Sequence, residues 1–189
     1  MIHLQDGPHQ ATVDQRGATL LNFRVKGTAV LHGPGAVVPE LGHHGAVLAP
    51  WPNRVEQGRY EHGGRTYQLP CNDVANGHAL HGVVFDRDWL VDDRADDAVT
   101  LSVRIADEPG YPFDIHLTVR YSILEGALRC EAYWRNLGRR TAPFGIGFHP
   151  YLVPGPSPMD DWILEIDAGE VFIPKHGGLR SEEHTSELQ

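Results

Sequence analysis

Residues 114–136 read DIHLTVRYSILEGALRCEAYWRN, and this stretch decides the fold class. Apolar side chains occupy every second position from Ile115 to Ile123, and the alternation resumes from Leu128 to Trp134. Between the two runs stands Glu125-Gly126, where glycine can adopt the positive φ of a tight turn. A period of two on both sides of a turn predicts an antiparallel hairpin with one buried face.

Shorter segments around this hairpin also have the composition of strands. Gly63-Gly64 predicts a second tight hairpin, between Arg59–Glu61 and Thr66–Leu69. No segment keeps an apolar period of 3.6, so we expect little helix. Many short strands separated by turns predict an all-β domain, either a sandwich or a barrel. The other predicted strands are Thr19–Val25, Ala29–Leu31, Trp89–Val91, Ala98–Ile105, Trp162–Ile166 and Glu170–Ile173.

The last ten residues differ from the rest of the chain. Residues 180–189 read RSEEHTSELQ, a polar segment without alternation that looks like the translation of a DNA-sequencing adapter. We interpret 180–189 as a non-native tail in preference to a native polar terminus. Residues 1–179 are then the N-terminal part of one domain, and the natural protein is expected to continue beyond them.

Charge and cysteine content restrict the partners and the compartment. The net charge of −9 argues against nucleic acid and against an anionic membrane surface, whereas a small neutral ligand is compatible with it. No apolar run approaches the roughly 20 residues of a membrane span, and polar residues 1–10 do not resemble a signal peptide. Cys71 and Cys130 lie far apart in the sequence, so we expect packed, reduced thiols in a cytoplasmic protein, with one disulfide as the alternative.

The segment Leu48–Val55 has the residue types of a sugar site. Its two prolines fix the backbone and remove hydrogen-bond donors, which predicts a rigid stretch outside any ladder. Trp51 offers an aromatic face, and Asn53 and Arg54 offer planar polar groups that can bridge hydroxyls. An ordinary loop with an exposed arginine is the simpler alternative.

Histidines mark three further segments. His78 and His81 would point to opposite faces of an extended chain, and no ligand cluster follows at zinc spacing. An acid/base or hydrogen-bonding role for His81 is therefore favoured over a metal site, with a solvated loop histidine as the alternative. His43-His44, in a glycine-flanked loop, is interpreted as such a solvated pair.

In residues 143–151, PFGIGFHPY, aromatic rings flank His149 and would desolvate its imidazole. Pro150 biases His149 toward an extended backbone, and the neighbouring glycines allow a ligand to approach closely. Tyr151 completes the aromatic surroundings. The alternative is a structural histidine in the core whose ring is hydrogen-bonded to the backbone.

Taken together and in this order, these segments resemble the aldose 1-epimerase (galactose mutarotase) family, from about residue 20 to residue 179. The matching elements are Pro50–Arg54, the Gly58, Tyr60, Gly64, Tyr67 and Leu69 hairpin, Leu80–Gly82 with Trp89, Gly110–Pro112, and Pro143–Tyr151.

This resemblance implies a large antiparallel β-sandwich and a hexose substrate, with no metal or organic cofactor. It implies that His149 is the general acid that protonates the ring oxygen and that His81 supports it. Arg54 and Asn53 would hold sugar hydroxyls, and we add Trp51 and Tyr151 as candidate sugar contacts. The family's late glutamate base and its sugar-binding aspartate cannot be placed in this chain, so we expect the 189-residue polypeptide to be a poor epimerase.

Three alternatives stay open at this stage. A hexose-phosphate epimerase would need a basic cluster, for which Arg24, Arg59 and Arg65 are available. A non-catalytic carbohydrate-binding or sensing module would bind sugar without needing the imidazoles. A metal-dependent jelly-roll enzyme would require a bound metal.

Overall fold

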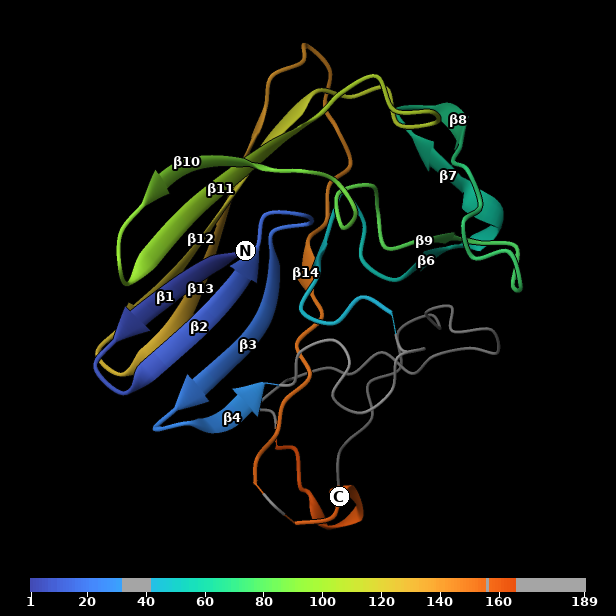
Figure 1. The fold of residues 1–189 in the computed structure, drawn as a ribbon. Helices are drawn as coiled ribbons and strands as arrows, with labels where there is room; N and C mark the ends of the chain where they lie inside the picture. Colours follow the sequence, from blue (N-terminus) through green and yellow to red (C-terminus); the bar gives the residue numbers. More distant parts are fainter. Residues whose placement is uncertain (32–41, 156, 166–189) are drawn as a thin grey trace.

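The computed structural model describes residues 1–31, 42–155 and 157–165, and this part of the chain contains strands, two 3₁₀ turns and no α-helix (Figure 1). One four-stranded antiparallel sheet has the order β1-β2-β3-β4, and another has the order β10-β11-β12-β13. The first sheet consists of β1 (Ile2–Asp6), β2 (His9–Asp14), β3 (Thr19–Val25) and β4 (Thr28–Leu31). The second consists of β10 (Leu90–Arg94), β11 (Ala98–Ile105), β12 (Ile115–Leu124) and β13 (Ala127–Asn136).

The predicted central hairpin is confirmed as β12 and β13. The strands pair from Ile115↔Asn136 to Leu124↔Ala127, across a turn in which Glu125 and Gly126 both have positive φ. Every second side chain of β12, from Ile115 to Ile123, is buried in the core. The alternation places one face of this hairpin against the first sheet, as the period of two predicted.

The two sheets share one apolar core. Leu4 and Val13 from the first sheet belong to the same buried cluster as Leu117 and Val119 from the second. Across the interface, the buried Tyr121 hydroxyl donates a hydrogen bond of 2.9 Å to the Ala18 carbonyl oxygen. The architecture is therefore a β-sandwich, and the sandwich alternative that the family resemblance favoured is confirmed.

Three two-stranded ladders lie beside the sheets, and two of them bring the predicted motifs together (Figure 1). Strand β5 (Val47–Leu48) pairs with β14 (Gly147–Phe148), and β6 (Arg54–Val55) pairs with β9 (Ala79–Leu80). The third ladder joins β7 (Arg59–His62) to β8 (Arg65–Gln68) across Gly63 and Gly64, which confirms the second predicted hairpin. The 3₁₀ turns are η1 (Glu56–Gly58) and η2 (Met159–Asp161).

Several strand predictions were wrong or incomplete. The hairpin β1–β2 was missed because its many polar residues obscured the buried alternation of Ile2, Leu4, Ala11 and Val13. Residues 162–165 form no strand, and Ile163 and Leu164 are exposed there. Predictions for Ile166, for Glu170–Ile173 and for the tail 180–189 lie outside the described residues.

The cysteines also depart from expectation. Cys71 and Cys130 are both free, as predicted, and both residues are exposed, but the Cys130 thiol itself packs against Tyr121, and its desolvation raises its pKa to about 12. Within the described ranges, no helix is long and apolar enough to cross a membrane.

Candidate active site

The β6–β9 ladder holds His81 against Asn53. The His81 amide donates to the Asn53 carbonyl oxygen at 2.9 Å, and the Asn53 amide donates to His81 Nδ1 at 3.1 Å. Because Nδ1 accepts a hydrogen bond, the neutral ring carries its proton on Nε2. Both residues have positive φ, 58° for Asn53 and 63° for His81. Such left-handed conformations are strained for a histidine and are typical of functional sites.

The β5–β14 ladder places His149 next to the same ring. The Gly45 amide donates to the His149 carbonyl oxygen at 2.8 Å, and the His149 amide donates to the Ala46 carbonyl oxygen at 3.1 Å. The His81 and His149 rings meet edge to face, with centroids 5.5 Å apart and planes at 88°. Two imidazoles from separate ladders therefore line one site.

His43 was assigned to a solvated pair by the sequence, and that interpretation is wrong for its ring. Its centroid lies 4.7 Å from that of His81, 4.7 Å from that of Phe85 and 6.4 Å from that of His149. The sequence signal for this position of His43 was local, because the glycines that flank the His43-His44 pair allow another segment to approach closely. A Cβ on Gly45 would lie 1.9 Å from the Leu20 carbonyl oxygen, so this loop passes tightly against β3.

His44 and Tyr151 extend the aromatic cluster. The His44 ring stacks on Tyr151 with centroids 3.9 Å apart, and Tyr151 stacks with His149 at 5.3 Å. Tyr151, a predicted sugar contact, is thus next to the predicted acid.

Burial and mutual repulsion keep two of the imidazoles uncharged. Desolvation, together with the neighbouring His43, His149 and Arg54, lowers the pKa of His81 to about 4. Desolvation also lowers the pKa of His43, with His149 adding to this and Asp86 opposing it. His43 and His81 are therefore neutral near pH 7.

Arg54 is oriented by a carboxylate that the sequence analysis did not select. Its Nε donates to Asp73 Oδ2 at 2.7 Å, and Asn76 Nδ2 donates to both oxygens of the same carboxylate. Hydrogen bonds from Arg54 and then Asn76 lower the pKa of Asp73. A terminal Arg54 nitrogen also reaches Asn53 Oδ1 at 3.4 Å. The guanidinium is thereby held beside the His81–Asn53 pair.

His78 has a structural place. Its ring is buried, and Nδ1 accepts a hydrogen bond of 3.1 Å from the Gln57 amide. It thus makes a different contact from His81, whose Nδ1 accepts from the Asn53 amide. Over the described part of the chain, no group of three or more His, Cys, Asp or Glu side chains is placed to hold a metal ion.

Trp51 is placed apart from the histidine rings. Its indole contacts Tyr111, with centroids 6.3 Å apart, and lines an apolar cavity of about 300 Å³ together with Phe144. Its Nε1 is buried and finds no hydrogen-bond partner among the described residues. The structure groups His81, His149, Asn53, Arg54 and Tyr151, and leaves Trp51 in the neighbouring cavity.

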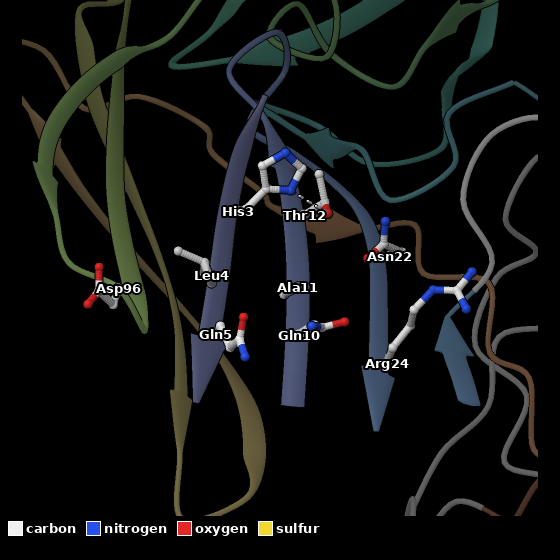
Figure 2. A pocket seen from close by; sticks show the side chains of 9 residues that line it. All are labelled: His3, Leu4, Gln5, Gln10, Ala11, Thr12, Asn22, Arg24 and Asp96. Carbon is white, nitrogen blue, oxygen red and sulfur yellow. Dashed lines mark hydrogen bonds between the residues drawn. The ribbon is translucent and has the colours of Figure 1, made fainter. Parts of the chain in front are cut away.

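A separate polar groove of about 670 Å³ lies over β1, β2 and β3 (Figure 2). The register aligns His3, Thr12 and Asn22 in one row across the strands, and Gln5, Gln10 and Arg24 in the next. Arg24 belongs to this groove, whereas Arg59 and Arg65 are exposed on β7 and β8. The three arginines considered for a phosphate site are therefore on separate elements.

Comparison with known proteins identifies the family of the chain. A family model described as aldose 1-epimerase matches residues 1–180. The uncharacterized protein YihR of Escherichia coli K12 is 33% identical over an alignment that covers 99% of this chain and 61% of YihR. Galactose mutarotase of Mus musculus is 30% identical over 58% of this chain and 32% of the mouse protein.

A solved structure shows the same fold. The galactose mutarotase related enzyme from Lactobacillus acidophilus superimposes with a TM-score of 0.71 at 20% identity, over 95% of this chain and 59% of that one. This chain thus spans less than two thirds of the length of these relatives. The match of the family model over nearly the whole sequence, together with the shared fold, places the chain in the aldose 1-epimerase family.

Proposed function

We propose that the protein is a mutarotase that interconverts the α and β anomers of a free hexose. The observation that carries this proposal is the contact between the His81 and His149 rings, 5.5 Å apart, beside the Arg54 guanidinium. Mutarotation needs one group that gives a proton to the ring oxygen and one that removes the proton of the anomeric hydroxyl. The mouse relative is named for this activity on galactose.

The acid role is assigned to His149. The family resemblance implies this role, and the contact of the His149 ring with His81, at 5.5 Å between centroids, supports it. As the C1–O5 bond breaks, its electron pair moves to O5, which takes the proton from His149; the base removes the proton of the anomeric hydroxyl, and the electron pair of that O–H bond forms the C1=O double bond of the open aldehyde. Rotation about C1–C2 and the reverse steps close the ring on either face.

Binding is assigned to the groups around His149. His81 presents Nε2–H as a neutral donor, since its Nδ1 is occupied by the Asn53 amide. Arg54, held by Asp73 at 2.7 Å, offers its remaining N–H groups to sugar hydroxyls, with Asn53 and Tyr151 beside it. Such preorganised donors act without reorganising during the reaction.

We assign the base to the family's late glutamate, in the stretch of the relatives that the alignment with this chain does not cover. Asp73, on the polar side of the site, is already paired with Arg54. We therefore expect the 189-residue chain to bind hexose weakly and to anomerise it poorly. A free sugar is favoured over a hexose phosphate because Arg24 lies in the groove over β1–β3, while Arg59 and Arg65 lie at opposite ends of the β7–β8 ladder.

Polarimetry tests the proposal. Freshly dissolved α-D-glucose and α-D-galactose are followed with residues 1–189 and with the natural gene product extended to the length of its relatives. The extended protein should accelerate the change in rotation, and His149→Asn should reduce kcat by about 10²–10⁴-fold while sugar still binds. Full activity in the His149→Asn protein would refute the acid assignment. Sugar binding without any acceleration would favour a carbohydrate-binding module instead.

A further inference from the structure

His43 occupies the centre of the ring cluster but has no part in the mechanism so far. Its ring meets His81 at 72° and Phe85 at 85°, both with centroids 4.7 Å apart. These are edge-to-face contacts, the arrangement that aromatic rings favour. His43 thus lies between the apolar ring of Phe85 and the ring of His81, which is proposed to donate to the sugar.

The backbone holds His43 in this place despite strain. Its φ is +71°, a left-handed conformation that is uncommon for histidine. The Ala46 amide donates to the His43 carbonyl oxygen at 3.0 Å, and the Ala46 carbonyl oxygen accepts from the His149 amide. The loop is anchored to β3 as well, because the Leu20 amide donates to the Gly45 carbonyl oxygen at 3.0 Å. Strain of this kind persists only where the surroundings enforce it.

We propose that His43 is a positioning residue that holds the His81 ring in the plane in which Nε2–H faces the sugar. The inference rests on the proposed function, since it names the support of one of its binding groups. The hydrogen bond to His81 Nδ1 is a single contact, and a single contact does not by itself stop the ring from tilting. The edge-to-face contacts of His81 with His43 and with His149 supply the lateral support that prevents this tilt.

The charges around the pair favour this arrangement near neutral pH. The charged and titratable groups around His43 are His81, His149 and Asp86, and those around His81 are His43, His149 and Arg54. Because burial lowers the pKa of both His43 and His81, the contact between them near pH 7 joins two uncharged rings. Acidification would charge both rings and drive them apart.

Exchange mass spectrometry on the 189-residue chain at micromolar concentration tests the proposal without any need for turnover. Amide exchange of Asn53 reports its hydrogen bond to His81 Nδ1, and exchange at the histidine C2 position across a pH series reports the titration of His81. His43→Asn keeps a residue that tolerates the left-handed backbone but removes the ring. His43→Phe keeps a ring, and His44→Asn is the matched control, because the His44 ring contacts Tyr151 and not His81.

In His43→Asn we expect the exchange protection factor of the Asn53 amide to fall about tenfold. This is the change expected when the net free energy of one hydrogen bond is lost. The His81 titration should also move upward from about 4. In His43→Phe and His44→Asn the protection of Asn53 should stay as in the parent chain. If His43→Asn does not fold, His43→Gly takes its place, since glycine accepts the same φ.

Unchanged Asn53 protection and unchanged His81 titration in the ring-free variant would overturn the proposal. Loss of protection in His43→Phe equal to that in His43→Asn would overturn it too, because the aromatic ring would then not be the positioning element. Neither readout depends on anomerisation, so the failure of the proposed function in polarimetry is recorded separately from the failure of this inference.

Discussion

At His81, one backbone hydrogen bond and the neighbouring side chains decide which proton the imidazole carries. The Asn53 amide occupies Nδ1, and desolvation together with His43, His149 and Arg54 disfavours a second proton. The ring is thus a fixed donor at Nε2 rather than a titrating group near neutral pH. Its positive φ shows that the backbone accepts strain in order to place it.

This environment makes stability depend on pH in a defined direction. The pKa of His81 is about 4 in the folded chain, against an ordinary value of 6.5. Between these values the unfolded chain binds a proton that the folded chain does not, so the free energy of unfolding falls as the pH drops from 6.5 toward 4. His43 acts in the same direction, since its pKa is also lowered.

Urea denaturation of the parent chain and of His81→Asn at pH 7 and at pH 4.5 measures the effect. The parent should lose more stability on acidification than the variant, because the variant lacks the His81 share. His3→Asn, on the outer face of β1 and outside the cluster, serves as the control and should keep the parent's dependence. An identical loss in the parent and in His81→Asn would contradict the expected role of the ring.

Among the elements, the short ladder β6–β9 and the residues that follow it do the most to build the site. Gly82 comes directly after His81, has φ of +75°, and bridges to Ala49 in parallel. The Val83 amide donates to the Ala49 carbonyl oxygen at 2.8 Å, so the two segments run in close contact. A Cβ at Gly82 would lie 1.9 Å from that oxygen. The proline-rich segment and the His81 segment can be adjacent only because residue 82 has no side chain.

Gly82→Ala should therefore cost about 3 kcal/mol or more in the free energy of unfolding, through backbone displacement added to conformational strain. Gly77→Ala is the matched control, because Gly77 has φ of +70° but no atom within 4 Å of the added Cβ. The control should cost only about 1–2 kcal/mol, the penalty of the left-handed conformation. Urea denaturation compares the two variants, and equal losses would show that the close approach to Ala49 does not matter.

At the scale of the whole molecule, β13 leaves apolar surface uncovered. Trp134 pairs with Leu117, which is fully buried in the core, yet the Trp134 side chain is 53% exposed. Tyr133, which pairs with Thr118 on the other face, is 59% exposed. Trp134 thus stands on the core side of the hairpin with only part of its surface covered, chiefly by stacking on Phe144 at 5.1 Å. An exposed apolar surface beside an edge strand favours association.

The 189-residue chain should accordingly self-associate with rising concentration and bind a hydrophobic dye. Trp134→Gln should weaken the association by about tenfold, through loss of apolar area that would be buried between copies. Tyr133→Gln, a change of similar size at a similarly exposed position on the opposite face, should have little effect. Light scattering across a dilution series measures both, and equal effects of the two substitutions would place the association elsewhere.

Local pattern explains which strands could be predicted. Strands β3 and β11 begin and end at the predicted residues, and β12–β13 differs from its prediction only at the ends. Alternation failed at β1–β2, where polar side chains outnumber the apolar ones, and at residues 162–164, where apolar residues are exposed. Alternation within one segment does not indicate whether a second sheet covers the apolar face of the predicted strand.

The site was predictable only in part, and its prediction rested on residue types and family resemblance and not on alternation. His81, His149, Asn53 and Arg54 were selected by their residue types and by family resemblance, and the structure places them together. Asp73 was missed because an aspartate in a polar loop carries no signal of its ion pair with Arg54. Trp51 fits a sugar-binding pattern, yet its ring faces Tyr111.

The all-β class, the central hairpin and the chemical types available to the site follow from the amino-acid sequence alone, because side-chain alternation and residue chemistry are local properties of a chain. Which rings meet depends on the folded arrangement of the chain. His43 joins His149 because Leu48 pairs with Gly147, and His81 joins Asn53 because Leu80 pairs with Arg54. Such pairings depend on the packing of segments distant in the chain, and a repeating pattern within one segment carries no record of them.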